Sequence, residues 1–273
     1  MISELPQREF EHVLPLYDEN RCLSIEPWAI IQRRNPGRAF VDNTERPTTA
    51  LVWSQGIEGF YLLGNPNNRD FNRSLSRLFD TIIAPEAMEI GYQWCEISGG
   101  DPSWNPVIET VFADQRLSSW QQSVYLYPGT QLKPGYPALP AGFRLATADE
   151  VLNTDKASQD SLLASAIQRY WTSQAAFSQH GVGYCALHED EIASVCFVSF
   201  RTHDVCALGI ETLKQHRQKG LGKAVGAATV QEVLAKAKRP YWDCSADNRA
   251  SAATAGSVGL EKAWEYTCYG YPF

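Results

Sequence analysis

The chain has 273 residues, and its 24 lysines and arginines against 31 aspartates and glutamates give a formal net charge of −7 at pH 7. This length fits one large domain or two modest ones, and it is enough to bury a core without disulfides or metals. A hydrophobic fraction of 44% and a charged fraction of 20% exclude a disordered or fibrous chain. The acidic balance argues against a nucleic-acid partner, because such binding depends on clustered cations.

The chain carries no recognisable targeting or membrane segment. Residues 1–6 lack the basic and apolar regions of a signal peptide, and the longest apolar stretch, residues 192–200, is far shorter than the ~20 residues of a membrane span. We therefore expect a soluble, cytoplasmic protein with no membrane partner. The sequence predicts nothing about its oligomeric state.

Seven cysteines form an odd set with no CxxC pair, and most lie inside apolar runs. A zinc site would need paired ligand spacing, so we expect buried free thiols that act as small apolar side chains, and no metal. The cysteines are Cys22, Cys95, Cys185, Cys196, Cys206, Cys244 and Cys268.

A stretch rich in proline and glycine, residues 128–142, divides the chain. Such a stretch cannot continue a helix or occupy a central strand, so we expect a linker between an N-terminal α/β domain, residues 1–127, and a C-terminal domain, residues 143–273. Residues 1–140 carry 11 basic and 17 acidic side chains, a net charge of −6, whereas the remainder carries 13 and 14, a net charge of −1. The acidity is therefore concentrated in the first half.

The C-terminal part has the order β-α-β-β-β-α-β-α-β, which predicts an α/β (α+β) fold with a mixed sheet flanked by helices. The expected strands are residues 143–147, 182–187, 192–200, 205–210, 241–245 and 263–269. The expected helices are one that follows Asp160 and ends before Gly181, and the segments 221–234 and 250–258.

The N-terminal part predicts a similar succession of elements. Residues 50–53 and 59–63 suggest a hairpin, apolar residues between 71 and 82 keep helical spacing, and residues 92–97 suggest another strand. This order leaves open a decayed internal duplication, in which the N-terminal half is a degenerate copy of the C-terminal one.

The most informative segment of the chain is basic. No acidic residue lies between Glu211 and Glu232, and two glycines, Gly220 and Gly222, occur where a helix is expected to begin. Glycine lets the backbone approach an anion closely, and unpaired N–H groups and the helix dipole favour negative charge at the same place. We therefore expect a site for phosphate or pyrophosphate. The basic residues of the segment are Lys214, Arg217, Lys219 and Lys223.

Three general interpretations apply to this segment. A Walker P-loop is excluded because Ala224 follows Gly222-Lys223 where Ser or Thr is required. A dinucleotide-binding fold is disfavoured because six residues separate Leu213 from Gly220, whereas its glycines should follow the strand directly. A solvated basic helix start without a ligand remains an alternative.

The pattern Arg217-x-x-Gly220-x-Gly222 resembles the Arg/Gln-x-x-Gly-x-Gly/Ala signature of the GNAT superfamily of N-acetyltransferases. Downstream residues are similar to the family's Asn-x-x-Ala/Ser…Gly-Phe segment, and the flanking residues resemble a two-part subgroup of the family. The downstream residues are Asn248, Ser251, Ala255, Gly259 and Leu260, and the flanking residues are Ile210 and Thr212 before the loop and Trp242-Asp243 after it.

This resemblance implies a mixed, mostly antiparallel sheet flanked by helices, which binds acetyl-CoA and transfers its acetyl group to a primary amine by direct attack. In such enzymes the loop amides bind pyrophosphate, the preceding strand pairs with pantetheine, and the asparagine hydrogen-bonds the pantetheine arm. The residues implied in cofactor binding are Ile210, Thr212, Arg217, Gln218, Lys219, Gly220, Leu221, Gly222, Lys223, Asn248 and Ser251.

The resemblance also suggests catalytic residues. Glu211 is the candidate general base, although it could equally balance the charge of the basic loop. Many members carry a tyrosine seven residues after the asparagine, where it can protonate the leaving thiolate, but Ala255 occupies that position here. Ser251, Cys244 or water would have to supply the proton, and Ser251 is expected close to the sulfur. We expect His216 to be a solvated loop residue.

The expected acceptor is a small cationic amine, such as a polyamine or an amino-bearing antibiotic, because an acidic first half over the acceptor side would attract it. Two-part relatives that modify antibiotics add weight to this expectation. A second hypothesis keeps the fold but not the activity: a non-catalytic CoA-binding or protein-interaction module.

Overall fold

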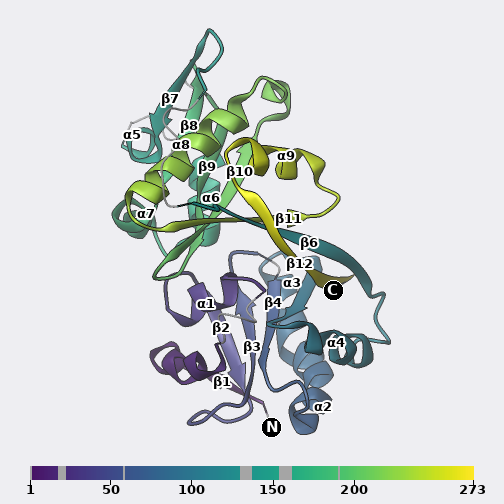
Figure 1. Ribbon diagram of the computed structural model, residues 1–273. Helices are drawn as coiled ribbons and strands as arrows, with labels where there is room; N and C mark the ends of the chain where they lie inside the picture. The colour runs from purple at the N-terminus through teal and green to yellow at the C-terminus, as the bar shows by residue number, and fades with distance from the viewer. Residues whose placement is uncertain (1, 18–22, 58, 130–136, 154–161, 190) are drawn as a thin grey trace. The chain divides into compact units, whose positions relative to one another are not determined.

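The computed structural model describes residues 2–17, 23–57, 59–129, 137–153, 162–189 and 191–273. The chain forms two compact units, one of Met1–Gln122 with Glu265–Phe273 and the other of Ser123–Trp264 (Figure 1). The last nine residues therefore belong to the first unit, although the sequence grouped them with 143–273. The reason is strand pairing, because Tyr269–Pro272 run antiparallel to Trp94–Ile97.

Unit 1 contains a sheet of order β1-β2-β3-β4-β5-β12. Its neighbouring strands are antiparallel except for the parallel pair β4–β5, which a helical segment connects. The strands are β1 (Ser3–Leu5), β2 (Gly37–Val41), β3 (Thr49–Ser54), β4 (Gly59–Gly64), β5 (Trp94–Gly99) and the end of β12 (Glu261–Pro272), and β6 (Ser118–Leu126) begins in this unit.

The helix predicted in unit 1 from the spacing of apolar residues is found, but it is divided into several segments. The expected helical run from residue 71 to 82 is found as α2 followed by a short π-helix, and α3 continues beyond it. The ring of Phe79 packs against those of Phe60 and Phe112 with centroid distances of 5.1 and 5.0 Å. The helical segments are α1 (Glu26–Ile31), α2 (Arg69–Leu78), the π-helix Phe79–Ile83, α3 (Ala84–Glu89), α4 (Asn105–Val111) and the 3₁₀ segments Gln7–Leu16 and Pro102–Trp104.

Unit 2 contains the sheet order β11-β10-β9-β8-β7. Its neighbouring strands are antiparallel except for the parallel pair β10–β11. Its strands are β7 (Phe143–Thr147), β8 (Gly183–His188), β9 (Glu191–Arg201), β10 (Val205–Thr212) and β11 (Arg239–Ser245); its helices are α5 (Ala148–Leu152), α6 (Leu162–Tyr170), α7 (Gln174–His180), α8 (Leu221–Ala235), α9 (Arg249–Ser257) and the 3₁₀ turn Lys214–His216.

The predicted strands of the C-terminal part are confirmed, but its helices differ from the prediction in two places. The single helix expected between Asp160 and Gly181 is divided into α6 and α7, because the Ser173 hydroxyl accepts the Ala176 N–H at 3.1 Å and caps a new helix start. Helix α5 was not predicted. The mixed, mostly antiparallel sheet flanked by helices is also confirmed.

The core of unit 2 lies between its sheet and α8, which crosses β8 and β9 (Figure 1). Thr229 of α8 joins this interface, because its buried hydroxyl donates to the Cys196 carbonyl at 3.1 Å. The six cysteines within the described residues are free and buried, as predicted, and Cys22 lies outside those residues. Across the described chain we find no helix with the length and apolar character that crossing a membrane requires.

Both units share one succession of elements. An antiparallel pair is followed by a helix and a parallel strand, as β3-β4-α2-β5 in unit 1 and as β9-β10-α8-β11 in unit 2. The two parallel pairs differ in how far along the strands their pairing extends. In unit 1 the pairing covers Gly59–Leu62 and continues through the Gly100 N–H, which donates to the Leu62 carbonyl at 2.7 Å.

Candidate active site

The central strands of unit 2 diverge at their carboxyl ends. Strand β10 extends to Thr212 and β11 to Ser245, but their register ends at the pair Ala207–Tyr241 in this fully described region. At the same place the register between β10 and β9 shifts, between Ala207 and Leu208, as in a β-bulge. A bulge bends a strand and increases its twist, so it provides a local cause for the divergence. The open edge of β10 over residues 208–212 therefore faces a cleft.

The basic loop closes one end of this cleft. Gln218 and Gly220 have left-handed backbone angles, with φ of +63° and +78°, and Gly220 is the N-cap of α8. The first helix amide with a carbonyl partner in this stretch is that of Ala224, which donates to the Gly220 carbonyl at 3.2 Å. The three preceding amides are the unpaired donors of a helix N-terminus, and they favour an anion.

Arg217 fixes this loop to the end of the strand. Its Nε donates to the carbonyl of Thr212 at 3.1 Å, and the Thr212 hydroxyl lies 2.7 Å from the hydroxyl of Ser194 on β9. The Ser194 hydroxyl also donates to the carbonyl of Glu211 at 3.1 Å. The end of β10 is therefore held by side-chain contacts to Ser194 of β9 and to Arg217 of the loop.

A cavity of about 650 Å³ occupies the cleft. Its volume lies within the range of small-molecule sites. Nearly all of the residues singled out from the sequence line it, together with three that the sequence did not indicate. The predicted residues are Ile210, Glu211, Thr212, Arg217, Gln218, Gly220, Leu221, Gly222, Lys223, Asn248 and Ser251, and the additional ones are His216, Ala250 and Thr254.

Lys219 is the predicted residue that does not line this cavity. Its ammonium lies 3.2 Å from Nδ1 of His216 and 5.5 Å from the centre of the Phe143 ring. The expectation of a solvated His216 is wrong, because its side chain is only 8% exposed and its Nε2 lies 2.9 Å from Oε2 of Glu191. No local sequence pattern indicates this cluster, since its members come from β7, β9 and the loop.

Asn248 and Ser251 are organised by the start of α9. The Asn248 side chain accepts the Ser251 N–H at 3.1 Å and so caps the helix. The Ser251 hydroxyl accepts a hydrogen bond from Nε1 of the buried Trp242 at 2.9 Å. The Trp-Asp strand and the Asn-x-x-Ser segment are therefore joined directly, and Trp242 fixes the position of the Ser251 oxygen beside the cavity.

The position at which many family members carry a tyrosine lies in the apolar core of this protein. Ala255 is fully buried and is part of the main apolar cluster of unit 2. Cys244, the other alternative donor, is buried, and desolvation raises the pKa of its thiol. The hydroxyl of Ser251 is thus the one side-chain O–H among the candidates that lies on the cavity wall in the described chain.

Glu211 is the one carboxylate among the described residues that line the cavity. It is exposed and lies on β10 between Ile210 and Thr212. This position can attract a cation and accept a proton, and the cavity's arginine and lysine, Arg217 and Lys223, come from the loop and the start of α8.

Comparisons with known proteins agree with this geometry. The family model described as GNAT acetyltransferase matches residues 24–269, most of the chain. The chain belongs to the GNAT acetyltransferase family. The resemblance inferred from the loop and the Asn-x-x-Ser segment is therefore confirmed, and the acyltransferase assignment with it.

Relatives of the family match along nearly the whole chain. The uncharacterized N-acetyltransferase YdfB of Bacillus subtilis (strain 168) is 25% identical over 271 residues, which cover 98% of each protein. A GCN5-related N-acetyltransferase-like protein from Streptococcus suis 89/1591 has a TM-score of 0.67 at 18% identity and covers 97% of this chain and 98% of its own. A tandem GNAT protein from the clavulanic acid biosynthesis pathway has a TM-score of 0.60 at 15% identity, with coverages of 100% and 98%. These two GNAT structures share the fold across both units.

Proposed function

We propose that unit 2 binds acetyl-CoA in the cleft between β10 and β11 and transfers the acetyl group to a primary amine of a small cationic molecule. The observation that carries this proposal is the divergence of the two strands after Ala207 and Tyr241, beside a basic helix start. Membership of the GNAT family indicates acetyl transfer as the class of reaction, and the positions of the residues that line the cleft support their roles in it.

The cleft fits the groups of acetyl-CoA. An open strand edge at residues 208–212 can pair with an amide-bearing arm as an added strand would. The unpaired amides of Leu221, Gly222 and Lys223 can bind pyrophosphate, and Arg217 and Gln218 line the same end. Asn248 and Ser251 line the opposite wall. Acetyl-CoA, when bound, supplies an activated thioester.

The protein's own contribution is positioning and proton transfer. Backbone amides at the end of β10 can polarise a carbonyl, in the manner of an oxyanion hole. Glu211 accepts the proton that an attacking amine loses, and the hydroxyl of Ser251, fixed by Trp242, donates toward the leaving sulfur. A thiol is a good leaving group, so weak acid assistance suffices.

The negative net charge of the protein favours a cationic acceptor. The chain has a net charge of −7, and residues 1–140 account for −6 of it. A negative field concentrates cations and speeds their encounter with the protein. Because Glu211 is the one carboxylate in the described cavity lining, an ammonium group is directed to the residue that takes its proton.

A second candidate function rests on Ala255. Its burial leaves the site without the tyrosine that many family members use, and this favours a protein that binds CoA without turnover. The two functions differ in one measurable property, which is the release of free thiol.

The test combines calorimetry with an assay of thiol release from acetyl-CoA over a panel of cationic, neutral and anionic amines. Binding with release for cationic amines supports the proposal, and binding without release supports the second function. Turnover confined to neutral or anionic amines contradicts the cationic acceptor. If Gly220→Asp binds CoA as tightly as the wild type, the loop is not the anion site.

A further inference from the structure

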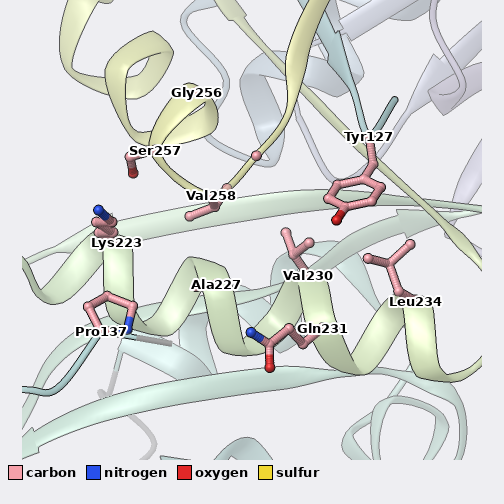
Figure 2. A pocket seen from close by; sticks show the side chains of 11 residues that line it. Tyr127, Pro137, Lys223, Ala227, Val230, Gln231, Leu234, Gly256, Ser257 and Val258 are labelled. Carbon is pink, nitrogen blue, oxygen red and sulfur yellow. The ribbon is translucent and has the colours of Figure 1, made fainter. Parts of the chain in front are cut away.

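Unit 1 contains a cavity of its own, of about 370 Å³, apart from the cleft of unit 2. A cavity along α8, shown in Figure 2, shares Lys223 with the cleft and so belongs with that site. The cavity of unit 1 shares no described residue with either of them, and its described lining lies entirely within Met1–Gln122. We call it the unit 1 cavity, and the proposed function makes no use of it.

The unit 1 cavity lies where the parallel strands β4 and β5 end. Its lining includes Gly64 at the end of β4 and Gly100 just after β5. The corresponding strands of unit 2 diverge to form the cleft, but here the pairing continues through Leu62, whose carbonyl accepts the Gly100 N–H at 2.7 Å. The edge of β4 is therefore occupied up to this point and cannot pair with a pantetheine arm, so we expect a different kind of ligand.

The charge of the lining favours a cation. Asp101 is the one charged side chain among the described residues that line the cavity, and its Oδ1 accepts the Ser103 N–H at 2.8 Å, which holds the carboxylate in place. A second carboxylate, that of Asp42, is bound to the wall, because it accepts the N–H and the hydroxyl of Thr48 at 2.9 and 2.6 Å. Two carboxylates without a lysine, arginine or histidine in this described lining attract a cation and repel an anion.

Most of the remaining wall is apolar, and it includes an indole. Trp28 of α1 is only 4% exposed, and the ring of Tyr17 packs edge-on against it with a centroid distance of 4.5 Å. An aromatic ring binds apolar groups and also attracts cations. The unit 1 cavity therefore combines a carboxylate with an aromatic and aliphatic wall, which suits an organic cation. The apolar lining residues are Pro15, Leu16, Trp28, Pro47 and Leu63.

We propose that the unit 1 cavity binds a small organic ammonium ion, with its charge at Asp101 and its apolar body against Trp28 and Leu63. The volume is low in the range of small-molecule sites and smaller than the 650 Å³ of the cleft, so it suits a compact amine. This inference does not rest on the proposed function, because it concerns another unit and another ligand.

The first test uses three probes of similar shape but different charge: 2-phenylethylammonium, 2-phenylethanol and phenylacetate. The full-length protein is titrated with each, and backbone amides are followed by NMR. The amides of Asn65, Gly100 and Asp101 report on the unit 1 cavity, and those of Glu211 and Gly222 report on the cleft. At the unit 1 amides we expect a Kd about tenfold lower for the ammonium than for the alcohol, and no shift with phenylacetate.

The second test removes the charge of the site. In Asp101→Asn the new side chain can still accept the Ser103 N–H, but it carries no charge. We expect its Kd for 2-phenylethylammonium to rise about tenfold. The matched control is Asp114→Asn, an exposed position of the same unit outside the cavity, whose Kd should stay within about twofold of the wild type.

Equal Kd values for the ammonium and the alcohol, or no shift of the unit 1 amides, overturn the inference. An unchanged Kd in a folded Asp101→Asn does the same. The three probes are compared on the wild type, so that comparison is decisive even if Asp101→Asn does not fold. A titration with CoA in the same spectra tests the proposed function separately, since CoA should shift the cleft amides and leave the unit 1 amides unchanged. If CoA shifts neither group, the proposed function fails while this inference stands, and if CoA shifts the unit 1 amides, the inference is wrong.

Discussion

His216 Nε2 lies 2.9 Å from Oε2 of Glu191, so a residue at the start of β9 holds the turn before the anion loop. The ammonium of Lys219 lies 3.2 Å from the other ring nitrogen, Nδ1. An ammonium group can only donate, so Nδ1 accepts, and Nε2 carries the hydrogen that is donated to Glu191. The pair of contacts therefore orients the imidazole and connects the loop to the sheet.

We predict that Glu191→Ala weakens CoA binding, raising its Kd about threefold to tenfold, because a hydrogen bond of about 1 kcal/mol no longer holds the loop. The kcat should change little, since the pair lies away from the reacting groups. Isothermal titration and steady-state kinetics measure the two quantities. Removing a negative charge near an anion site would by itself tighten binding, so Glu189→Ala, on the same hairpin, serves as the control. A Kd that equals that of the control contradicts the role of the pair.

Gly220→Ala is expected to lower the unfolding free energy by about 1 kcal/mol, because φ of +78° is unfavourable for a residue with a Cβ. The added methyl group itself would meet no atom within 4 Å. Gly91 is a matched control, with φ of +91° and equally open surroundings in unit 1. Both variants should lose stability in urea titrations, but only Gly220→Ala should lose CoA affinity. Equal CoA affinities in the two variants would show that the loop conformation is not needed for binding.

Glu211→Gln should lower kcat about 10²- to 10⁴-fold if the carboxylate is the general base, while the Kd for CoA stays close to that of the wild type. The amide keeps the size and hydrogen-bonding capacity of the side chain but cannot take a proton at neutral pH. Rapid-quench measurements with a cationic amine test this loss at the chemical step. If kcat is retained and only the KM for the amine rises, Glu211 attracts the acceptor and does not remove its proton.

The buried thiols should make the protein less stable at alkaline pH. Burial raises the pKa of Cys185 and of Cys196 to about 12 and that of Cys206 to about 11, above the unperturbed value. Because the folded-state pKa is raised, the stabilising contribution is complete below the unfolded-state pKa and is lost as pH rises toward the folded-state values. Urea unfolding should show a roughly constant free energy from pH 7 to about 8.5 and a fall above it of up to about 1.4 kcal/mol per pH unit for each thiol.

Alkylation provides an independent measurement of the same groups. At pH 8 these three thiols should react with iodoacetamide only after the protein is unfolded, because the thiolate is the reactive form. Replacement of Cys196 by alanine should reduce the alkaline loss of stability. Rapid alkylation of the folded protein at any of the three positions would contradict their burial.

The local elements of unit 2 could be predicted because their signals are local. Short apolar runs over 192–200 and 205–210 correspond to β9 and β10, and Gly220 and Gly222 mark the start of α8, as found. The anion loop and the Asn-x-x-Ser segment were recognisable for the same reason, since their backbone geometry depends on a few adjacent residues. Unit 1 was less predictable. Its helical run is divided by a π-helix at Phe79–Ile83, which apolar spacing cannot reveal.

The role of His216 could not be predicted, because its partner Glu191 is 25 residues earlier in the chain. The same limit applies to the last nine residues, whose pairing partners in β5 lie more than 170 positions before them. Thr254 lines the cleft because it is three residues after Ser251 on α9, and helical spacing could have found it.

The chain is acidic, with a net charge of −7, but its charge is unevenly distributed, and the basic segment between Glu211 and Glu232 contains the anion loop. The sequence by itself therefore determined the family, the loop and the residues around it, because each is encoded in short, contiguous patterns. Only the tertiary structure decided that β10 and β11 separate after Ala207 while β4 and β5 stay paired through Leu62. That difference arises from a bulge and from backbone hydrogen bonds between distant strands, and such pairing leaves no trace in local composition.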